Sequence, residues 1–270
     1  MIGIITSSID TLYLFQFLNR YNFSYVVWYD QEWGNRGEKP SSYVLPRVTK
    51  AIEELKKQWV THVIVPPTIE CLLLEDAQYK DIILPLFTTY VKQQCLPFSR
   101  VGKIGFCGDR LDIQSKNEIE KLCSSHTLTE VQAKTQSFQN PLAYWFKETP
   151  MRKYFLTSLW WKNWMMHNVV KQDMHYFLDA WVDTVIPLNY WYFAYDATIA
   201  KLVTTKKTRR HRIETLHTIF NSLVQKLAQS DYKVTIFYTG TNAHLLNEKK
   251  RMWLLEKGKE APVSFHLVAA

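Results

Sequence analysis

Short runs of β-branched and aliphatic residues alternate along the chain with longer amphipathic stretches. Three such runs open the sequence and are typical of buried strands: residues 2–5, 25–29 and 62–65. Asp10 is a candidate cap for a helix after the first run. A second helix is indicated before the third run by apolar residues at helical spacing, Val48, Ile52, Leu55 and Trp59. This β-α-β-α-β order predicts a parallel sheet with right-handed crossovers.

A second cycle of the same kind begins at residues 103–108, whose Ile-Gly pair repeats the opening of the chain. Ile119 and Leu122 indicate a helix after it, residues 140–178 are predicted to be mostly helical, and residues 183–187 are predicted to form a strand. Each half therefore has an Ile-Gly strand and a later Val-Ile strand that ends in a polar turn. We interpret this as a weak internal duplication.

Other parts of the chain continue this alternation. Residues 84–87 are predicted to be a short fourth strand of the first half. Near the C-terminus, strands are predicted at residues 234–238 and 263–268, after a helix whose apolar stripe is Ile213, Leu216, Phe220, Leu223 and Leu227. The chain has no low-complexity linker, so compact turns must cross any domain boundary.

The composition is that of a globular protein with reduced thiols. At 270 residues, of which 47% are apolar, the chain can bury the core of one large domain or of two small ones. No apolar run approaches the ~20 residues that span a bilayer, and the N-terminus lacks the positive region of a signal peptide. The spacing of the cysteines argues against a disulfide framework or a structural zinc site and predicts a cytoplasmic protein: Cys71, Cys95, Cys107 and Cys123.

The net charge of +8 is compatible with an anionic ligand, a nucleic acid or an acidic membrane surface, although a basic solvated surface is the favoured interpretation. The densest basic run, residues 206–212, adjoins no aromatic residue, whereas basic grooves for single-stranded nucleic acid include stacking aromatics. We therefore expect this run to be a solvated loop that leads into a helix. We expect no nucleic-acid partner and no membrane partner.

Two segments share the arrangement of a buried strand that ends in a polar turn. The first spans residues 61–68, with the sequence THVIVPPT, and the second spans residues 183–192, with the sequence DTVIPLNYWY. In α/β proteins the carboxyl ends of such strands are where ligands bind. The sequence therefore predicts a ligand site at these turns.

Both segments resemble the thiol-bearing motifs of the cofactor-independent aspartate/glutamate racemases, in which each strand ends in a cysteine. Pro66 and Asn189 stand in place of the two cysteines. Residues 2–12 are similar to the family's first strand, and residues 29–40 resemble the loop whose backbone amides hold the substrate carboxylate. Residues 104–113 and 237–241 resemble two further strand motifs of the family.

The resemblance implies an α/β fold of two pseudo-symmetric α/β domains with parallel sheets and an interdomain cleft. It places residues 1–97 and 208–270 in the first domain and residues 98–207 in the second. It also implies a protein without a cofactor, whose cleft takes a small anionic ligand such as an amino acid or a related carboxylate. The residues that it places at the cleft are Ser7, Asn35, Arg36 (the carboxylate anchor), Gly37, Thr68, Asn189 and Tyr190.

Inversion of an α-carbon without a cofactor requires a base on one face and an acid on the other. Proline has no proton to exchange, and an asparagine amide is neither an acid nor a base in the useful range. The resemblance further implies that Thr6 and Trp191 replace an aspartate and a histidine that support proton transfer. The leading hypothesis is a racemase-fold protein that has lost racemisation, has no catalytic residue, and binds a ligand or a partner at the old cleft.

Two other functions stay open. One is an active isomerase or lyase of the same superfamily that uses carboxylates such as Asp30, Asp109 or Asp112 as acid and base. The other is a protein-interaction module that works through the basic run and the Trp-rich segment. Core packing or a homodimer interface is the favoured role of the tryptophans in that segment, Trp145, Trp160, Trp161 and Trp164.

Two further groups of residues are interpreted as structural. Cys71 and Cys107 are predicted to be small buried residues rather than relocated nucleophiles. The second group could in principle bind a metal: His167, Asp173, His175 and Asp179. The spacing of its two histidines is not that of a helical metal-ligand pair. The sequence therefore predicts neither a metal site nor a cofactor.

Overall fold

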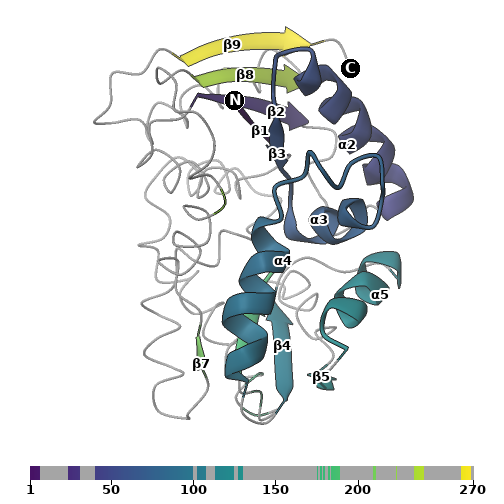
Figure 1. Cartoon of the computed structure of the whole chain (residues 1–270), viewed down its shortest axis with the longest axis vertical. Helices are drawn as coiled ribbons and strands as arrows, with labels where there is room; N and C mark the ends of the chain where they lie inside the picture. Colours follow the sequence, from purple (N-terminus) through teal and green to yellow (C-terminus); the bar gives the residue numbers. More distant parts are fainter. Residues whose placement is uncertain are drawn as a thin grey trace, which may run out of the picture. The chain divides into compact units, whose positions relative to one another are not determined.

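The computed structural model describes residues 1–6, 24–30, 40–99, 102–107, 113–124, 127–129, 175, 177, 179, 182, 184–188, 209–210, 223, 234–239 and 263–268. The chain packs as two compact units. Unit 1 is Met1–Leu86 with Phe220–Ala270, and unit 2 is Phe87–Ile219. Each unit contains one parallel β-sheet (Figure 1).

The sheet of unit 1 runs in the order β3 (His62–Ile64), β1 (Ile2–Thr6), β2 (Tyr25–Asp30), β8 (Val234–Thr239) and β9 (Val263–Val268). Every neighbouring pair of these strands is parallel. All residues of β1 are buried, as expected when helices and loops cover both faces of a parallel sheet. The predicted strands at both ends of the chain are therefore confirmed, and the C-terminal pair extends the sheet beyond β2.

The sheet of unit 2 runs in the order β5 (Thr127–Thr129), β4 (Lys103–Cys107), β6 (Thr184–Pro187) and β7 (Arg209–Arg210). Its neighbouring strands are also parallel. Ile104 and Phe106 of β4 and Ile186 of β6 are fully buried, so these two strands form the centre of the unit's core.

The two sheets have the same topology around their first strand. In unit 1, β1 lies between β2 and β3, and in unit 2, β4 lies between β5 and β6, so the second and third strands flank the first in both. The register also agrees, because Gly3 pairs with Val63 and Gly105 pairs with Val185. The predicted fold of two pseudo-symmetric α/β halves is confirmed by this repeated arrangement.

The glycine of each Ile-Gly pair allows a side chain to pack directly on the strand. A Cβ on Gly105 would lie 2.5 Å from the ring of Phe177, which is itself fully buried. A Cβ on Gly3 would lie 2.9 Å from Val60 and 3.0 Å from Leu55. All three distances are shorter than ordinary van der Waals contact, so the close approach explains why each first strand carries glycine.

Helix α2 (Ser41–Lys56) contacts β1 and β2 and supplies much of the core of unit 1 (Figure 1). Five apolar residues of this helix recur at helical spacing and are buried: Val44, Val48, Ala51, Ile52 and Leu55. Burial of each large aliphatic side chain contributes about 1.5–3 kcal/mol. This packing outweighs the missing backbone donor of Pro46 inside the helix, where Thr49 donates its hydroxyl to the Pro46 carbonyl at 3.0 Å.

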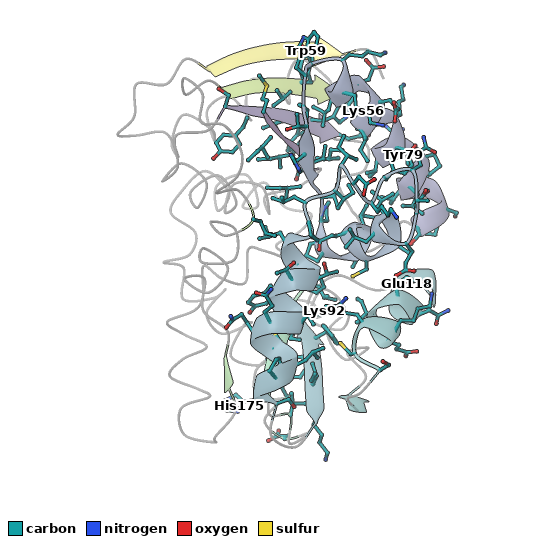
Figure 2. The ribbon with its side chains drawn as sticks, in the orientation of Figure 1. Lys56, Trp59, Tyr79, Lys92, Glu118 and His175 are labelled. Carbon is teal, nitrogen blue, oxygen red and sulfur yellow. The ribbon has the colours of Figure 1, made fainter. Side chains whose placement is uncertain are left out.

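Trp59 does not continue the stripe of α2, and its predicted place on the helix is wrong. The helix ends at Lys56, and Trp59 has a φ of 60° and an exposed fraction of 85%. Trp59 is labelled among the side chains in Figure 2. The chain turns here to enter β3. After the turn, the Thr61 N–H donates to the Met1 carbonyl at 3.1 Å. Val60 points into the core instead, with an exposed fraction of 5%.

The predicted strand at residues 84–87 is also wrong. Ile83 forms one isolated parallel bridge with Val63, the Leu84 N–H donates to the Val63 carbonyl at 2.9 Å, and helix α4 (Leu86–Tyr90) begins two residues later. Pro85 explains the change, because proline has no N–H for a strand ladder and favours the start of a helix.

The remaining helices of the described residues are short. Helix α3 (Pro67–Leu74) follows β3, and α4 continues into a π-helical turn, η3 (Val91–Cys95), and a 3₁₀ turn, η4 (Leu96–Phe98). Helix α5 (Ile113–Leu122) follows β4 and buries Ile119, as predicted. Within the ranges described, no helix combines the length and the apolar character needed to cross a membrane.

Candidate functional site

The carboxyl ends of β1, β2 and β3 lie at one edge of the sheet of unit 1, because the three strands are parallel neighbours. Thr6 ends β1, Asp30 ends β2, and Pro66 follows β3 after one residue. All three are buried. The carboxyl edge of a parallel sheet is where α/β proteins bind ligands, so this edge is the candidate site.

The junction between β3 and α3 is built from two prolines. Pro66 has extended backbone angles, with φ −59° and ψ 150°, as expected for a residue that precedes a proline, and Pro67 is the first residue of α3. The Pro66 carbonyl accepts hydrogen bonds from the N–H groups of Ile69 at 2.9 Å and Glu70 at 2.8 Å. Because Pro66 and Pro67 have no N–H, Thr68 is the first residue of this turn with a backbone donor.

Thr68 is the predicted lining residue that falls within the described part of the chain. It is half-buried in the first turn of α3, directly after the two prolines. Its hydroxyl can donate and accept, but it is not an acid or a base near neutral pH. The other predicted lining residues lie outside the described residues: Ser7, Asn35, Arg36, Gly37, Asn189 and Tyr190.

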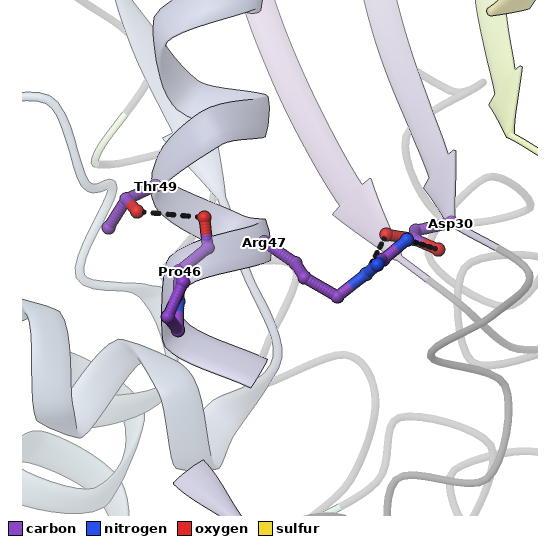
Figure 3. Close-up of polar contacts among 4 residues, drawn as sticks. All are labelled: Asp30, Pro46, Arg47 and Thr49. Atoms are coloured by element: carbon purple, nitrogen blue, oxygen red, sulfur yellow. Dashed lines mark hydrogen bonds and ion pairs between the residues drawn. The ribbon is translucent and has the colours of Figure 1, made fainter. Parts of the chain in front are cut away.

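Asp30 is held by Arg47 of α2 in a two-pronged ion pair (Figure 3). Arg47 Nε donates to one carboxylate oxygen at 2.8 Å, and Arg47 Nη2 donates to the other at 3.0 Å. The Asp30 side chain has an exposed fraction of 5%, against 27% for Arg47. A carboxylate with both oxygens engaged and almost no solvent contact is poorly suited to exchange protons with a ligand.

Glu70 is a carboxylate at this junction that we did not single out from the sequence. It lies in the first turn of α3 and is fully buried. A negative charge there complements the positive end of the helix dipole. Its surroundings in the sequence, an apolar ECLLL run, indicate a buried helix but do not mark the carboxylate itself as buried.

The described residues at this edge include two buried carboxylates, and the Pro66 turn itself carries no ionisable side chain. Pro66 has no proton to give or take, and Thr6 and Thr68 carry hydroxyl groups. Of the carboxylates described here, Asp30 is paired with Arg47 and Glu70 is buried. The Thr68 hydroxyl can donate a hydrogen bond to a ligand at this edge or accept one from it.

The matching edge of unit 2 is described as far as Leu188. Pro187 ends β6 opposite Cys107 of β4, and Leu188 is buried directly after it. Asn189 is the next residue in the chain, and it lies outside the described residues, as do the carboxylates Asp109 and Asp112.

The cysteines are placed as structural residues. Cys71, Cys95 and Cys123 are buried, which confirms the predicted burial of Cys71. Burial raises the pKa of the Cys123 thiol to about 12 and raises the pKa of the Cys95 thiol well above its ordinary value. A thiol that stays protonated is a weak nucleophile and a weak base. Cys107 lies on β4, as predicted.

Other candidates from the sequence are partly described. His175 and Asp179 are exposed, and no group of metal-ligating side chains occurs among the residues that the structure describes. Arg209 and Arg210 form strand β7 beside β6, so the prediction that these two residues lie in a loop is wrong. His167, Asp173 and the tryptophans of residues 145–164 lie outside the described ranges.

No protein-family model matches the sequence, and neither does any curated protein. Solved structures match it closely in fold. Glutamate racemase isoform RacE1 of Bacillus anthracis has a TM-score of 0.71 and 16% identity, over 99% of this chain and 97% of that one. Glutamate racemase of Francisella tularensis, in complex with D-glutamate, has a TM-score of 0.65 and 15% identity, over 99% and 96%. Escherichia coli glutamate racemase, in complex with L-glutamate and the activator UDP-MurNAc-ala, has a TM-score of 0.65 and 11% identity, over 100% and 98%.

These matches agree with the repeated three-strand arrangement of the two units and with the strand-and-turn order read from the sequence. They confirm the predicted resemblance at the level of the fold, from one end of the chain to the other. This chain therefore has the glutamate racemase fold.

Proposed function

We propose that this protein binds a small carboxylate, such as an amino acid, at the carboxyl edge of its sheets and does not racemise it. The fold supports the position of the site, because it matches glutamate racemases over 99% of the chain. The replacement of both family cysteines, by Pro66 and Asn189, supports the loss of racemisation.

The observation that carries the proposal is the β3–α3 junction. Pro66 stands at the turn where the resemblance expects a thiol, it is buried, and it is followed by a second proline that fixes its backbone. Neither proline carries an ionisable side chain, and neither has an N–H that could bind an anion. What remains at this turn is the N–H and hydroxyl of Thr68, which suit hydrogen bonding to a ligand rather than proton transfer.

The ligand class follows from the charge and from the similar structures. Two of these were solved with glutamate, in its D form for Francisella tularensis and its L form for Escherichia coli. This chain has a net charge of +8 and places Arg36 in the segment that resembles the carboxylate-binding loop. A guanidinium binds a carboxylate through two parallel hydrogen bonds, so Arg36 is the proposed anchor.

The test is a calorimetric titration of the full chain with D-glutamate and L-glutamate. Arg36→Ala should weaken binding by about 1.5–3 kcal/mol, the contribution of hydrogen bonds to a charged group. Lys57→Ala is the matched control, since it removes one positive charge from an exposed ion pair with Glu54 at 2.7 Å. Saturable binding that is unchanged in Arg36→Ala would refute the anchor, and no saturable binding of either enantiomer by the wild type would refute the ligand class.

A competing proposal is an active isomerase or lyase that uses carboxylates in place of the thiols. The ion pair with Arg47 speaks against Asp30 in this role, since both carboxylate oxygens accept from the guanidinium. Asp109 and Asp112 remain the candidates for that chemistry. α-Proton exchange distinguishes this function from ligand binding alone.

A further inference from the structure

The Asp30–Arg47 ion pair joins strand β2 to helix α2, on either side of the segment 31–39. Asp30 is the last residue of β2, which lies between β1 and β8 in the sheet of unit 1. The segment 31–39 follows it directly, Pro40 then caps α2, and Arg47 lies in the second turn of that helix. The pair therefore joins the two ends of the segment that carries Asn35, Arg36 and Gly37.

Both partners of the pair are themselves firmly held. Asp30 pairs in register with Thr239 of β8, and its carboxylate is nearly inaccessible to solvent. Helix α2, which carries Arg47, is anchored by its buried stripe, and its first turn is closed by N–H groups of Tyr43 and Val44 that donate to the Pro40 carbonyl. The Arg47 guanidinium also lies over the Tyr43 ring, 5.9 Å from its centroid.

We propose that Arg47 is a positioning residue for ligand binding, because its bond to Asp30 ties α2 to the end of β2, and these are the two elements that flank residues 31–39. The inference rests on the proposed function, since it assigns Arg47 to the placement of the anchor Arg36. Arg47 itself is not a ligand anchor, because two of its N–H groups are already directed at Asp30. A lysine at 47 would keep the charge but lose the forked contact, since its ammonium is a point donor.

The test compares hydrogen exchange and ligand binding in four variants of the full chain: Arg47→Met, Arg47→Lys, Asp30→Asn and the double variant Asp30→Asn/Arg47→Met. We expect Arg47→Met to speed amide exchange in residues 31–39 by about tenfold or more, with little change in β1 and α3. Tryptic cleavage at the Arg36–Gly37 bond should speed up in parallel. Glutamate binding should weaken by about tenfold in the calorimetric titration, and Arg47→Lys should fall between Arg47→Met and the wild type.

The matched control is Lys57→Met, which breaks the exposed Lys57–Glu54 pair at the end of the same helix. It should leave both readouts at the wild-type value. The double variant removes the pair without leaving a buried unpaired carboxylate. If Arg47 acts through Asp30, this variant should show no greater exchange in residues 31–39 than Arg47→Met alone.

Two results would overturn the inference. One is unchanged exchange in residues 31–39 of folded Arg47→Met or Arg47→Lys. The other is exchange that rises equally throughout unit 1, which would indicate a general structural role. If wild-type protein binds neither enantiomer of glutamate, the proposed function fails, while the exchange data still decide whether Arg47 holds the segment.

Discussion

Pro66 and Pro67 determine what the β3–α3 junction can do chemically. They leave the turn without an ionisable side chain and without its first two N–H donors, although the strand and the helix on either side are those of a glutamate racemase fold. Single residues also explain local features elsewhere in the fold. Two of them, Gly105 and Trp59, give stability predictions that do not depend on any ligand.

Gly105→Ala should destabilise the protein by about 1–3 kcal/mol, the usual cost of overpacking a core. The added Cβ would lie 2.5 Å from the Phe177 ring and 3.0 Å from Val182, and the ring is fully buried. Urea unfolding measures the change. In a Phe177→Leu background the same substitution should be less costly, because the smaller side chain leaves room. An equal cost in both backgrounds would show that Phe177 does not pack on Gly105.

Trp59→Gly should stabilise the protein by about 0.5–1 kcal/mol. Trp59 has a φ of 60°, a region that is unfavourable for a side chain with a Cβ, and an exposed fraction of 85%, so little packing is lost. Gln58→Gly is the control. Gln58 is also exposed but does not have a positive φ, so glycine at this position should destabilise the protein. A lower melting temperature for Trp59→Gly would mean that the indole makes a contact that outweighs its backbone cost.

At the scale of elements, helices α2 and α3 and the turn η3 bury polar groups that the sequence pattern alone does not mark as buried. Helix α2 supplies the partner of Asp30, α3 buries Glu70, and η3 buries Cys95. Such groups couple the packing of an element to its protonation state. The clearest case is Cys123, directly after α5, because its thiol is fully buried.

The free energy of unfolding should therefore fall with rising pH above about 9. Burial raises the pKa of Cys123 from 9.0 to about 12, so the unfolded chain loses this proton first and the stabilising effect disappears between these two values. The expected slope is up to about 1.4 kcal/mol per pH unit for one thiol. Urea unfolding from pH 8 to 10.5 measures it. Cys123→Ala should be less sensitive to pH in this range, and identical slopes in the two proteins would contradict the assignment.

At the scale of the whole molecule, most strands of the two sheets were predictable from the sequence, because buried parallel strands are continuous apolar runs. Strands β5 and β7 and the order of the strands within each sheet were not predicted. The repeated Ile-Gly and Val-Ile strands predicted the internal symmetry that β1–β3 and β4–β6 confirm. The errors have tertiary causes. Trp59 fits the helical period, yet α2 ends before it and the chain turns there toward β3. Residues 84–87 are apolar, yet Pro85 has no N–H with which to join a strand ladder.

The candidate site was less predictable than the fold. Pro66 and Thr68 were placed at a strand end by their motif, and the structure puts them there. The engagement of Asp30 was not predictable, because its partner Arg47 lies 17 residues away on another element. The buried state of Glu70 likewise depends on packing around α3 rather than on its own position in the sequence. Whether a carboxylate can act as a base depends on ion pairs and hydrogen bonds to side chains on other elements.

We propose that the chain keeps the glutamate racemase fold and lacks the proton-transfer chemistry of the racemases. The most direct measurement is α-proton loss from each enantiomer of glutamate and aspartate in deuterated water, followed by NMR. Exchange requires only one competent base, and each missing acid–base partner forfeits a factor of about 10²–10⁴, so we predict no exchange above the protein-free rate. Protein-dependent exchange that persists in Cys71→Ser and Cys107→Ser would contradict the claim and indicate a carboxylate base. Exchange abolished by either substitution would also contradict it and indicate a relocated thiol.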